Sequence, residues 1–221
     1  MKATYSEEIA GSIFRFLVAD NWHLNFHSED GIFHFGLNLS NKIKNIDFFA
    51  RLNASDYTIH CVCPMHADPD DRDMMCRIAI FLHLANYNLR NGNFELDIHD
   101  GEIRFKSHVD CDGLTSPTTA MVRNSIYICA SMFKHYGDAI YHIIHNGMTP
   151  EEAIALSEEC KDACSSEDDE DVSEIFNDGT DSPEVPPVSE EPAVPDLGVV
   201  DDDDIDDLLQ LIQEMNQPDE A

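Results

Sequence analysis

The chain has 221 residues, of which 43% are hydrophobic, which is enough for one domain with a substantial core and an appendage. Its formal charge of −31 is unevenly distributed: residues 157–221 hold 24 acids and one base, whereas residues 1–156 hold 20 acids and 12 bases. A surface of this sign repels phosphate backbones, so the composition argues against direct binding to DNA or RNA.

The N-terminal stretch MKATYSEEIAGSIFRFLVADNW carries acids and an arginine within its apolar part, which is not typical of a signal peptide. No apolar run approaches the roughly 20 residues that a membrane span requires. Seven cysteines without the spacing of a disulfide framework fit reduced thiols. We therefore expect a soluble, cytoplasmic protein with no membrane partner.

The first predicted element is a helix over residues 5–20, because its apolar residues recur at helical spacing: Ile9, Ile13, Phe16 and Leu17. The period then changes to two, and the Asp-Gly pair at residues 30–31 predicts a hairpin with a two-residue turn. That register places Phe26 opposite Phe35 and makes a cross-strand pair of His27 and His34. The large apolar side chains then share one face, as in a sheet that helices cover on one side.

Two further strands are predicted over residues 46–52 and 57–63, and the second runs into HCVCPMH at residues 60–66. Histidine and cysteine are the side chains that hold zinc. Neighbours on a strand point to opposite faces, so His60 points away from Cys61 and Cys63, which extend the apolar row as small hydrophobes. We therefore favour a structural role. The alternative is a metal- or thiol-responsive regulator that uses Cys61, Cys63 and neighbouring histidines.

The next predicted helix starts at Asp68 as its cap, with Pro69 in the first turn and the apolar stripe Met75, Ile78, Leu82, Ala85 and Leu89. A second hairpin follows, in which a turn at residues 100–101 pairs Ile98 with Ile103. The polar positions of this hairpin are interpreted as a solvated strand face with cross-strand charge pairs, or alternatively as the lining of a site: Asn93, Glu95, Asp97, Glu102 and Arg104.

The longest helix is predicted to begin at residues 116–117 and to stop at Gly147, unless Gly137 interrupts it earlier. The sequence TPEE at residues 149–152 is a capping box that opens a last helix. The predicted order is one helix, four strands, one helix, two strands and two helices. This order indicates an α+β fold, an antiparallel sheet with helices on one face.

The stretch RIAIFLHLANYNLRNGNFELDIHDGEIRFKSHVD at residues 77–110 resembles the YbjN family of small bacterial proteins, most specifically in LANYNLRNGNFELD and DGEIRFK. The segments DGIFHFGLNL, AMVRNSIYICASMFKHYGDAI and TPEEAI fit the same family, and the resemblance covers residues 5–157. It implies a fold similar to type III secretion chaperones, which usually form homodimers, and a loosely defined role in regulating sensory transduction. It supplies no catalytic residues. The long acidic tail and the cysteine-rich and histidine-rich fourth strand depart from the family pattern.

The sequence therefore divides into a YbjN-like α+β domain at residues 1–160, a disordered acidic, proline-rich linker at 161–201, and a short amphipathic helical segment at 202–217. The last segment places apolar residues at helical spacing after a run of acids. A helix this short is marginal alone, so we expect it to dock on a groove of a partner, on a copy of itself or on its own head domain. Its apolar anchors are Ile205, Leu208, Leu209, Ile212 and Met215.

A search for enzyme signatures finds no phosphate-binding glycine loop, nucleophile elbow or zinc-protease motif. We assign no catalytic residue, metal ligand or cofactor. The sequence predicts a non-enzymatic protein-binding module, a chaperone-like or regulatory adaptor that binds protein partners or client peptides. Besides the tail anchors, Phe49 and Val62 on the polar face of the sheet are predicted to contact a partner or a second subunit. An unrecognised enzyme is the more distant alternative.

Overall fold

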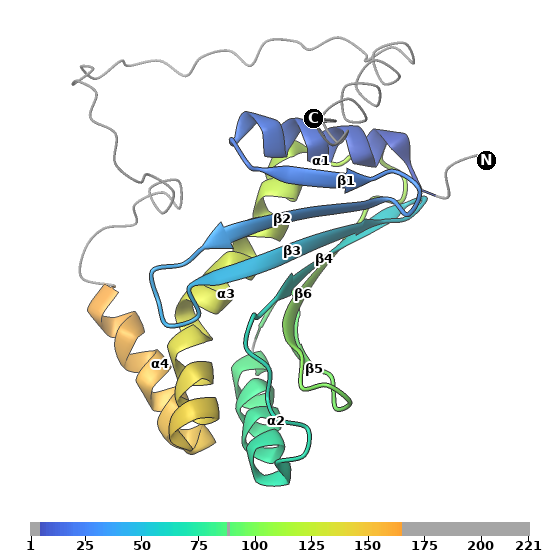
Figure 1. Ribbon diagram of the computed structural model, residues 1–221. Coiled ribbons are helices and arrows are strands. Elements are labelled where there is room, and N and C mark those ends of the chain that lie inside the picture. Colours follow the sequence, from blue (N-terminus) through green and yellow to red (C-terminus); the bar gives the residue numbers. More distant parts are fainter. Residues whose placement is uncertain (1–4, 88, 165–221) are drawn as a thin grey trace, which may run out of the picture.

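A computed structural model describes residues 5–87 and 89–164. The linker predicted at 161–201 therefore begins too early, because residues 161–164 still belong to a helix, and the rest of the linker and the C-terminal docking segment lie outside the described residues. The described part has the predicted α+β class and the predicted order of elements (Figure 1). Its elements are α1 (Glu7–Ala19), β1 (Leu24–His27), β2 (Ile32–Asn38), β3 (Asn45–Leu52), β4 (Asp56–Val62), α2 (Arg72–Asn86), β5 (Asn93–Leu96), β6 (Ile103–Asp110), α3 (Thr119–Asn146) and α4 (Pro150–Cys164).

The six strands form one sheet in the order β1-β2-β3-β4-β6-β5, and every neighbouring pair is antiparallel. The helices lie on one side, where α3 crosses behind the sheet, α2 packs against β5, and α4 packs against α3 and α2 (Figure 1). The edge strands β1 and β5 have four residues each, whereas the interior strands have seven or eight. The sheet therefore has long central strands and short edges.

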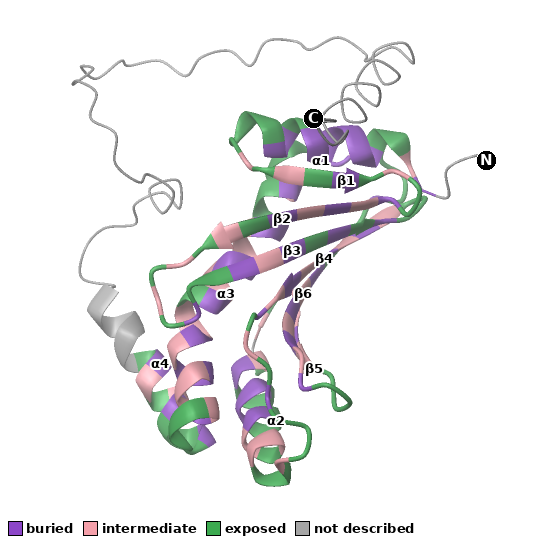
Figure 2. Cartoon of the chain, in the orientation of Figure 1, coloured by how far each residue is buried: buried purple, intermediate pink, exposed green. Residues whose placement is uncertain are grey.

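Alternation along the strands separates the two faces, as buried and accessible residues follow one another in β3 and β4 (Figure 2). The face toward the helices carries the large side chains of the core. Each such side chain stabilises the fold by about 1.5–3 kcal/mol when it leaves water. Fully buried examples are Phe33, Phe48, Tyr57, Ile59, Phe105 and Phe133.

Both hairpins have the predicted faces but not the predicted register. Phe26 pairs with Phe33 instead of Phe35, and Ile103 pairs with Leu96 instead of Ile98. The reason is the length of the loops. The first loop is the four residues 28–31, and in the second the four residues 98–101 separate Asp97 from Glu102, which are joined by a hydrogen bond of 2.9 Å from the Asp97 amide. The final glycine of each adopts a left-handed conformation and donates its amide to the carbonyl of the residue before the four, over 2.9 Å in both cases. A shift of two residues leaves the strand side chains on their predicted faces. Ile98 is the exception, because it falls in the loop and is 71% exposed.

The helix α2 begins at Arg72, later than predicted, because Asp71 and not Asp68 is its cap. The Asp71 carboxylate accepts a hydrogen bond of 2.9 Å from the Met74 amide. Asp68 instead accepts from the Asp70 amide within the preceding turn. The capping group is therefore the acid nearest to the first helical turn.

The predicted stripe of α2 is correct in its centre and wrong at its ends. Ile78, Leu82 and Ala85 are buried, and Phe81 joins them, although the prediction did not include it. Met75 is only partly buried, and Leu89 lies beyond the end of the helix.

The two last helices begin and end with recognisable caps. Thr118 caps α3, two residues later than predicted; Gly147 ends the helix as predicted, and Gly137 does not interrupt it. At α4 the predicted capping box is formed, with the Glu152 amide donating to the Thr149 hydroxyl and the Thr149 amide donating to the Glu152 carboxylate. Among the helices described, none combines the length and the apolar character needed to cross a membrane.

Candidate functional site

The side chains that point away from the helices form a surface that we call the open face. Cross-strand pairing arranges them in rows, and the middle row crosses all six strands: Asn25, His34, Phe49, His60, Lys106 and Asn93. One flanking row contains Gly36, Asp47, Val62, Arg104 and Glu95. The other contains His27, Ile32, Arg51, Thr58 and His108.

Phe49 is the exposed aromatic residue near the centre of this face. Its side chain is 37% exposed, and the ring of His34 stacks on it with 4.7 Å between centroids and an interplanar angle of 9°. His34 is held in turn by Asp47, 3.1 Å from its Nε2. Val62 lies opposite Asp47 on β4, so the two residues predicted to contact a partner, Phe49 and Val62, are diagonal neighbours on the open face.

His60 lies between Phe49 on β3 and Lys106 on β6 in the middle row. Partial burial is the main cause that lowers the pKa of His60, and the charges of Arg104, Lys106 and Arg51 lower it further, against an opposing effect of Glu95. A histidine with a lowered pKa is neutral at neutral pH. The centre of the face therefore presents an uncharged imidazole beside an aromatic ring.

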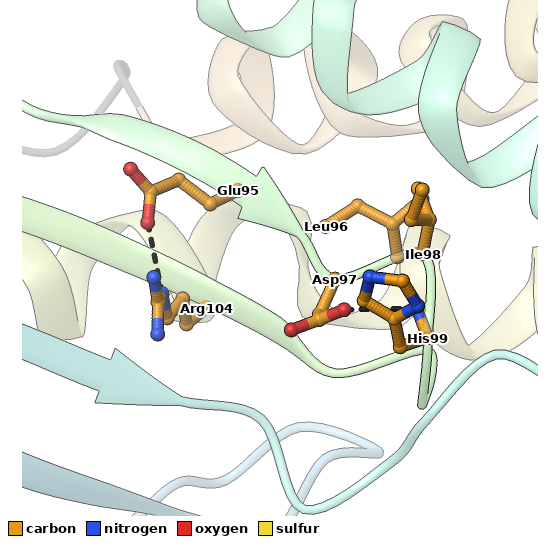
Figure 3. Close-up of a pocket in the computed structure, with 6 residues that line it drawn as sticks. All are labelled: Glu95, Leu96, Asp97, Ile98, His99 and Arg104. Atoms are coloured by element: carbon orange, nitrogen blue, oxygen red, sulfur yellow. Dashed lines mark hydrogen bonds and ion pairs between the residues drawn. The ribbon is translucent and has the colours of Figure 1, made fainter.

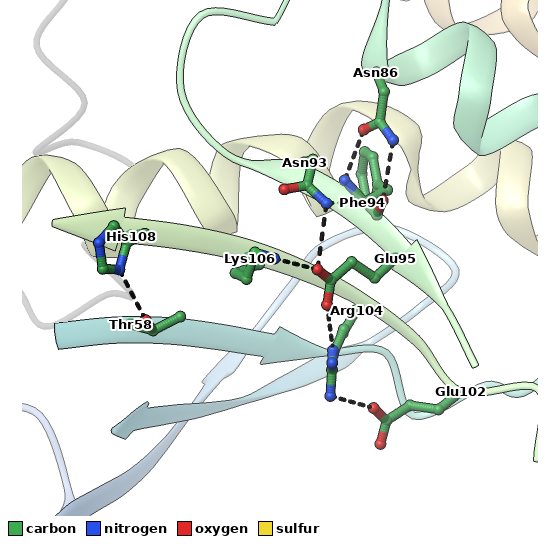
Figure 4. Close-up of polar contacts among 9 residues, drawn as sticks. All are labelled: Thr58, Asn86, Asn93, Phe94, Glu95, Glu102, Arg104, Lys106 and His108. Carbon is green, nitrogen blue, oxygen red and sulfur yellow. Dashed lines mark hydrogen bonds and ion pairs between the residues drawn. The ribbon is translucent and has the colours of Figure 1, made fainter. Parts of the chain in front are cut away.

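A carboxylate and two cations hold the β5–β6 side of the face together (Figure 4). Glu95 accepts hydrogen bonds from Arg104, at 2.8 Å, and from Lys106. Burial alone raises the pKa of Glu95, but the hydrogen bonds and charges of Lys106 and Arg104 outweigh it and lower the pKa overall. The predicted cross-strand charge pairs of this hairpin are thus present in the structure.

A shallow pocket of about 560 Å³ opens next to this cluster, at the loop between β5 and β6 (Figure 3). Its lining residues are Glu95, Leu96, Asp97, Ile98, His99 and Arg104. The two carboxylates already have partners, since Glu95 binds Arg104 and Asp97 accepts from the amide of His99 at 2.8 Å. The pocket therefore offers a polar surface but not a pair of carboxylates poised for acid–base chemistry.

Cys61 in β4 and Cys63, which directly follows the strand, are part of the core. Cys61 and Cys63 have no exposed surface, and burial raises the pKa of Cys63 to about 11 and that of Cys61 well above its ordinary value. The thiolate is the form that binds metal and reacts with oxidants, so these two thiols are poorly suited to either task. Within residues 5–87 and 89–158, whose side chains the structure describes, no three histidine, cysteine or acidic side chains gather as metal ligands.

The predicted cross-strand pair of His27 and His34 is not formed. Because the hairpin register is shifted by two residues, His27 lies opposite Ile32 and His34 lies opposite Asn25. The middle row of the open face was not predicted from the sequence, because that row depends on the same hairpin register. The alternation indicated that its members share a face, but the loop lengths decide which of them lie opposite one another.

The comparisons with known proteins leave the family open. A scan of the chain against protein-family models finds no match, and a search of the curated proteins finds none either. The resemblance to the YbjN family therefore remains a prediction from the sequence motifs. The tail residues predicted to anchor a partner, Ile205, Leu208, Leu209, Ile212 and Met215, lie outside the described residues.

Proposed function

We propose that the chain is a non-enzymatic protein-binding module, a chaperone-like or regulatory adaptor, and that its open face binds an acidic partner segment with an apolar anchor. One observation carries this proposal. The helices cover one side of the sheet, and the other side presents Phe49 at its centre, framed by histidines and cations. An aromatic anchor within a polar rim is the usual anatomy of a protein interface.

The charge around Phe49 supports an acidic partner. The three central rows of the face hold the cations Arg51, Arg104 and Lys106 against the carboxylates Asp47 and Glu95, whereas the next pair along β4 and β6, Asp56 opposite Asp110, is acidic and the chain as a whole has a formal charge of −31. Opposite potentials steer association and suppress wrong partners. A carboxylate beside the apolar anchor of the partner would meet Arg104 or Arg51, and the anchor itself would pack on Phe49.

Two expectations from the resemblance are part of the same proposal. A sheet covered by helices on one face is compatible with a YbjN-like domain of the secretion-chaperone type, and such a domain is expected to form a homodimer. The tail anchors would then add a second contact to the same partner or to another one.

The proposal is tested by selecting 16-residue peptides from a random display library on the purified full chain. We expect the enriched peptides to combine aspartate or glutamate with an aromatic or aliphatic residue. Phe49→Asp should weaken their binding at least tenfold, because it removes the anchor site and adds a repelling charge.

Val18→Asp is the matched control, because Val18 is 50% exposed but belongs to α1, among the helices. It should leave peptide affinity unchanged. Circular dichroism and thermal unfolding are used to check that both variants stay folded. No enrichment, or peptides that bind the Phe49→Asp chain as tightly as the original, would contradict the proposal.

A further inference from the structure

The outer surface of α2 carries a row of exposed apolar side chains, which we call the α2 outer stripe: Cys76, Ile80, Leu84 and Tyr87. Ile80, Leu84 and Tyr87 are 45%, 40% and 75% exposed, and they are three of the seven large apolar side chains that the described residues leave exposed. The inner surface of the same helix is buried through Ile78 and Phe81. A helix that is apolar on two sides is typical of an element covered from both sides.

The spacing makes the stripe a continuous surface. At 100° per residue its four members fall within an arc of about 80°, and at 1.5 Å per residue they span about 16 Å along the helix. Both ends of this surface are open, because Arg72 and Tyr87 are exposed. A stripe about 16 Å long can receive about three turns of a second helix.

Three arginines belong to α2 or follow it closely, although the head as a whole is acidic. Residues 72–90 contain Arg72, Arg77 and Arg90 against Asp73, and three further acids, Asp68, Asp70 and Asp71, precede the helix. The Nε of Arg77 is buried and has no hydrogen-bond partner among the described atoms. An occupant with carboxylates beside its apolar residues would therefore complement this surface.

The chain contains a segment of this chemistry. Within residues 201–215 there are seven acids and no base, and the apolar residues from Ile205 to Met215 recur at helical spacing over ten positions, about 15 Å in a helix. Both the length and the charge match the α2 outer stripe. We propose that residues 205–215 dock on the α2 outer stripe of the same chain as an amphipathic helix, with their flanking acids toward Arg72, Arg77 and Arg90.

The connection between the two is long enough. Helix α2 packs against α4, the last described element, and residues 165–204 separate the end of α4 from Ile205. Forty residues with coil dimensions span about 35 Å on average. Tethering gives the segment an effective concentration of about 1 mM, so a contact with an intrinsic Kd of about 100 µM would be about 90% formed.

The docking surface is separate from the open face, so the docking of the tail and the binding of a partner to the open face are tested independently. In the docked state the tail anchors contact the α2 outer stripe of their own chain. A partner that binds these anchors must then compete with α2. This gives the tail a regulatory role, in which the α2 outer stripe limits access to Leu208 and Leu209.

The test uses the full chain with Cys160→Ser and Cys164→Ser, which leaves Cys76 as the exposed cysteine of the described part. A second cysteine is placed at either end of the segment, in one chain as Asp204→Cys and in another as Asn216→Cys. A short bismaleimide is added, and the linked peptides are mapped by mass spectrometry. We expect an efficient link within one chain from Cys76 to one of these two positions.

Leu208→Asp together with Leu209→Asp should reduce the yield of this link at least fivefold, as should Ile80→Glu together with Leu84→Glu. Val18→Glu is the matched control on the head and should leave the yield unchanged. A chain with Ala193→Cys in the linker gives the yield that tethering alone produces. Thermal unfolding is used to check that the head remains folded in each variant.

Three results would overturn the proposal. The first is a yield no higher than that of the Ala193→Cys chain. The second is a yield that neither double substitution lowers. The third is a link between two chains, recognised in a mixture of ¹⁴N- and ¹⁵N-labelled protein, which would assign the stripe to a second copy.

Discussion

His60 on the open face makes the free energy of unfolding depend on pH. The pKa of His60 is lowered by partial burial and by Arg104, Lys106 and Arg51, while Glu95 acts in the opposite direction. The unfolded chain therefore takes up a proton at His60 before the native chain does. Since the unfolded state then binds more protons, the contribution of His60 makes the fold less stable as the pH falls through about 6.5 toward the lower pKa of the native state.

This leads to a pH-dependent prediction for His60→Gln. The variant cannot take up the proton, so its free energy of unfolding should fall less between pH 7.5 and pH 5.5 than that of the original chain. Urea unfolding at the two pH values measures the difference. Asn25→Gln, in the same row of the open face, changes no titratable group; it is the control and should keep the original pH dependence. Equal slopes for the original chain and His60→Gln would show that the pKa of His60 is not lowered.

The cysteines allow a second prediction at this scale. Cys76 is exposed on α2, whereas Cys61, Cys63 and Cys129 are buried. We expect iodoacetamide to label Cys76 in the native protein, at a rate limited by undocking of the tail, and to leave the three buried thiols unlabelled until the chain is unfolded, because a buried protonated thiol is a poor nucleophile. Peptide mapping after timed labelling gives the rates. Fast native labelling of Cys61 or Cys63 would favour the alternative of a thiol-responsive regulator.

Gly101 provides a third prediction. Its φ is +73°, and a Cβ placed on it would lie 1.8 Å from the carbonyl oxygen of Ala67. Gly101→Ala therefore combines a left-handed alanine, at about 1–2 kcal/mol, with overpacking of about 1–3 kcal/mol, and should lower the free energy of unfolding by about 3 kcal/mol. Gly113 has a similar φ of +78° but open space around it, so Gly113→Ala should lose only about 1–2 kcal/mol. Urea unfolding measures both, and equal losses would contradict the close approach to Ala67.

At the scale of helices and strands, the sequence predicted the order of elements and the face of each strand, because a period of two or 3.6 depends only on local spacing. It did not predict the hairpin register, since a four-residue loop ending in glycine and a two-residue turn share the same Asp-Gly pair. The tight packing of Gly101 on Ala67, far away in sequence, helps to fix that loop. The α2 outer stripe was missed because Phe81, Ile80 and Leu84 make the helix apolar on both sides, so no single stripe stands out.

The cap of α2 can be tested directly. Asp71→Ala removes the acceptor for the Met74 amide and should lower the free energy of unfolding by about 1 kcal/mol. Asp68→Ala removes only a turn hydrogen bond and should have a smaller effect. The two variants change charge equally, so the comparison isolates the cap. A larger loss for Asp68→Ala would show that the helix begins where the sequence pattern placed it.

At the scale of the whole molecule, the expected homodimer must form through a surface other than the open face, because the proposed partner binds there. Sedimentation of the full chain should give twice the 24.9 kDa of one chain if the resemblance predicts the assembly correctly. We expect Phe49→Asp to leave that mass unchanged, because the open face is proposed to bind a different protein. If Phe49→Asp yields the single-chain mass, the open face is the dimer interface and its proposed partner must be abandoned.

The short edge strands have a consequence for how the protein behaves when it is crowded. A sheet grows by adding a strand along an edge, and β1 and β5 offer only four residues each for such an addition. A neighbouring chain can therefore form few main-chain hydrogen bonds there before it meets a loop. The seven- and eight-residue strands, which would make the better template for fibrils, are enclosed between them.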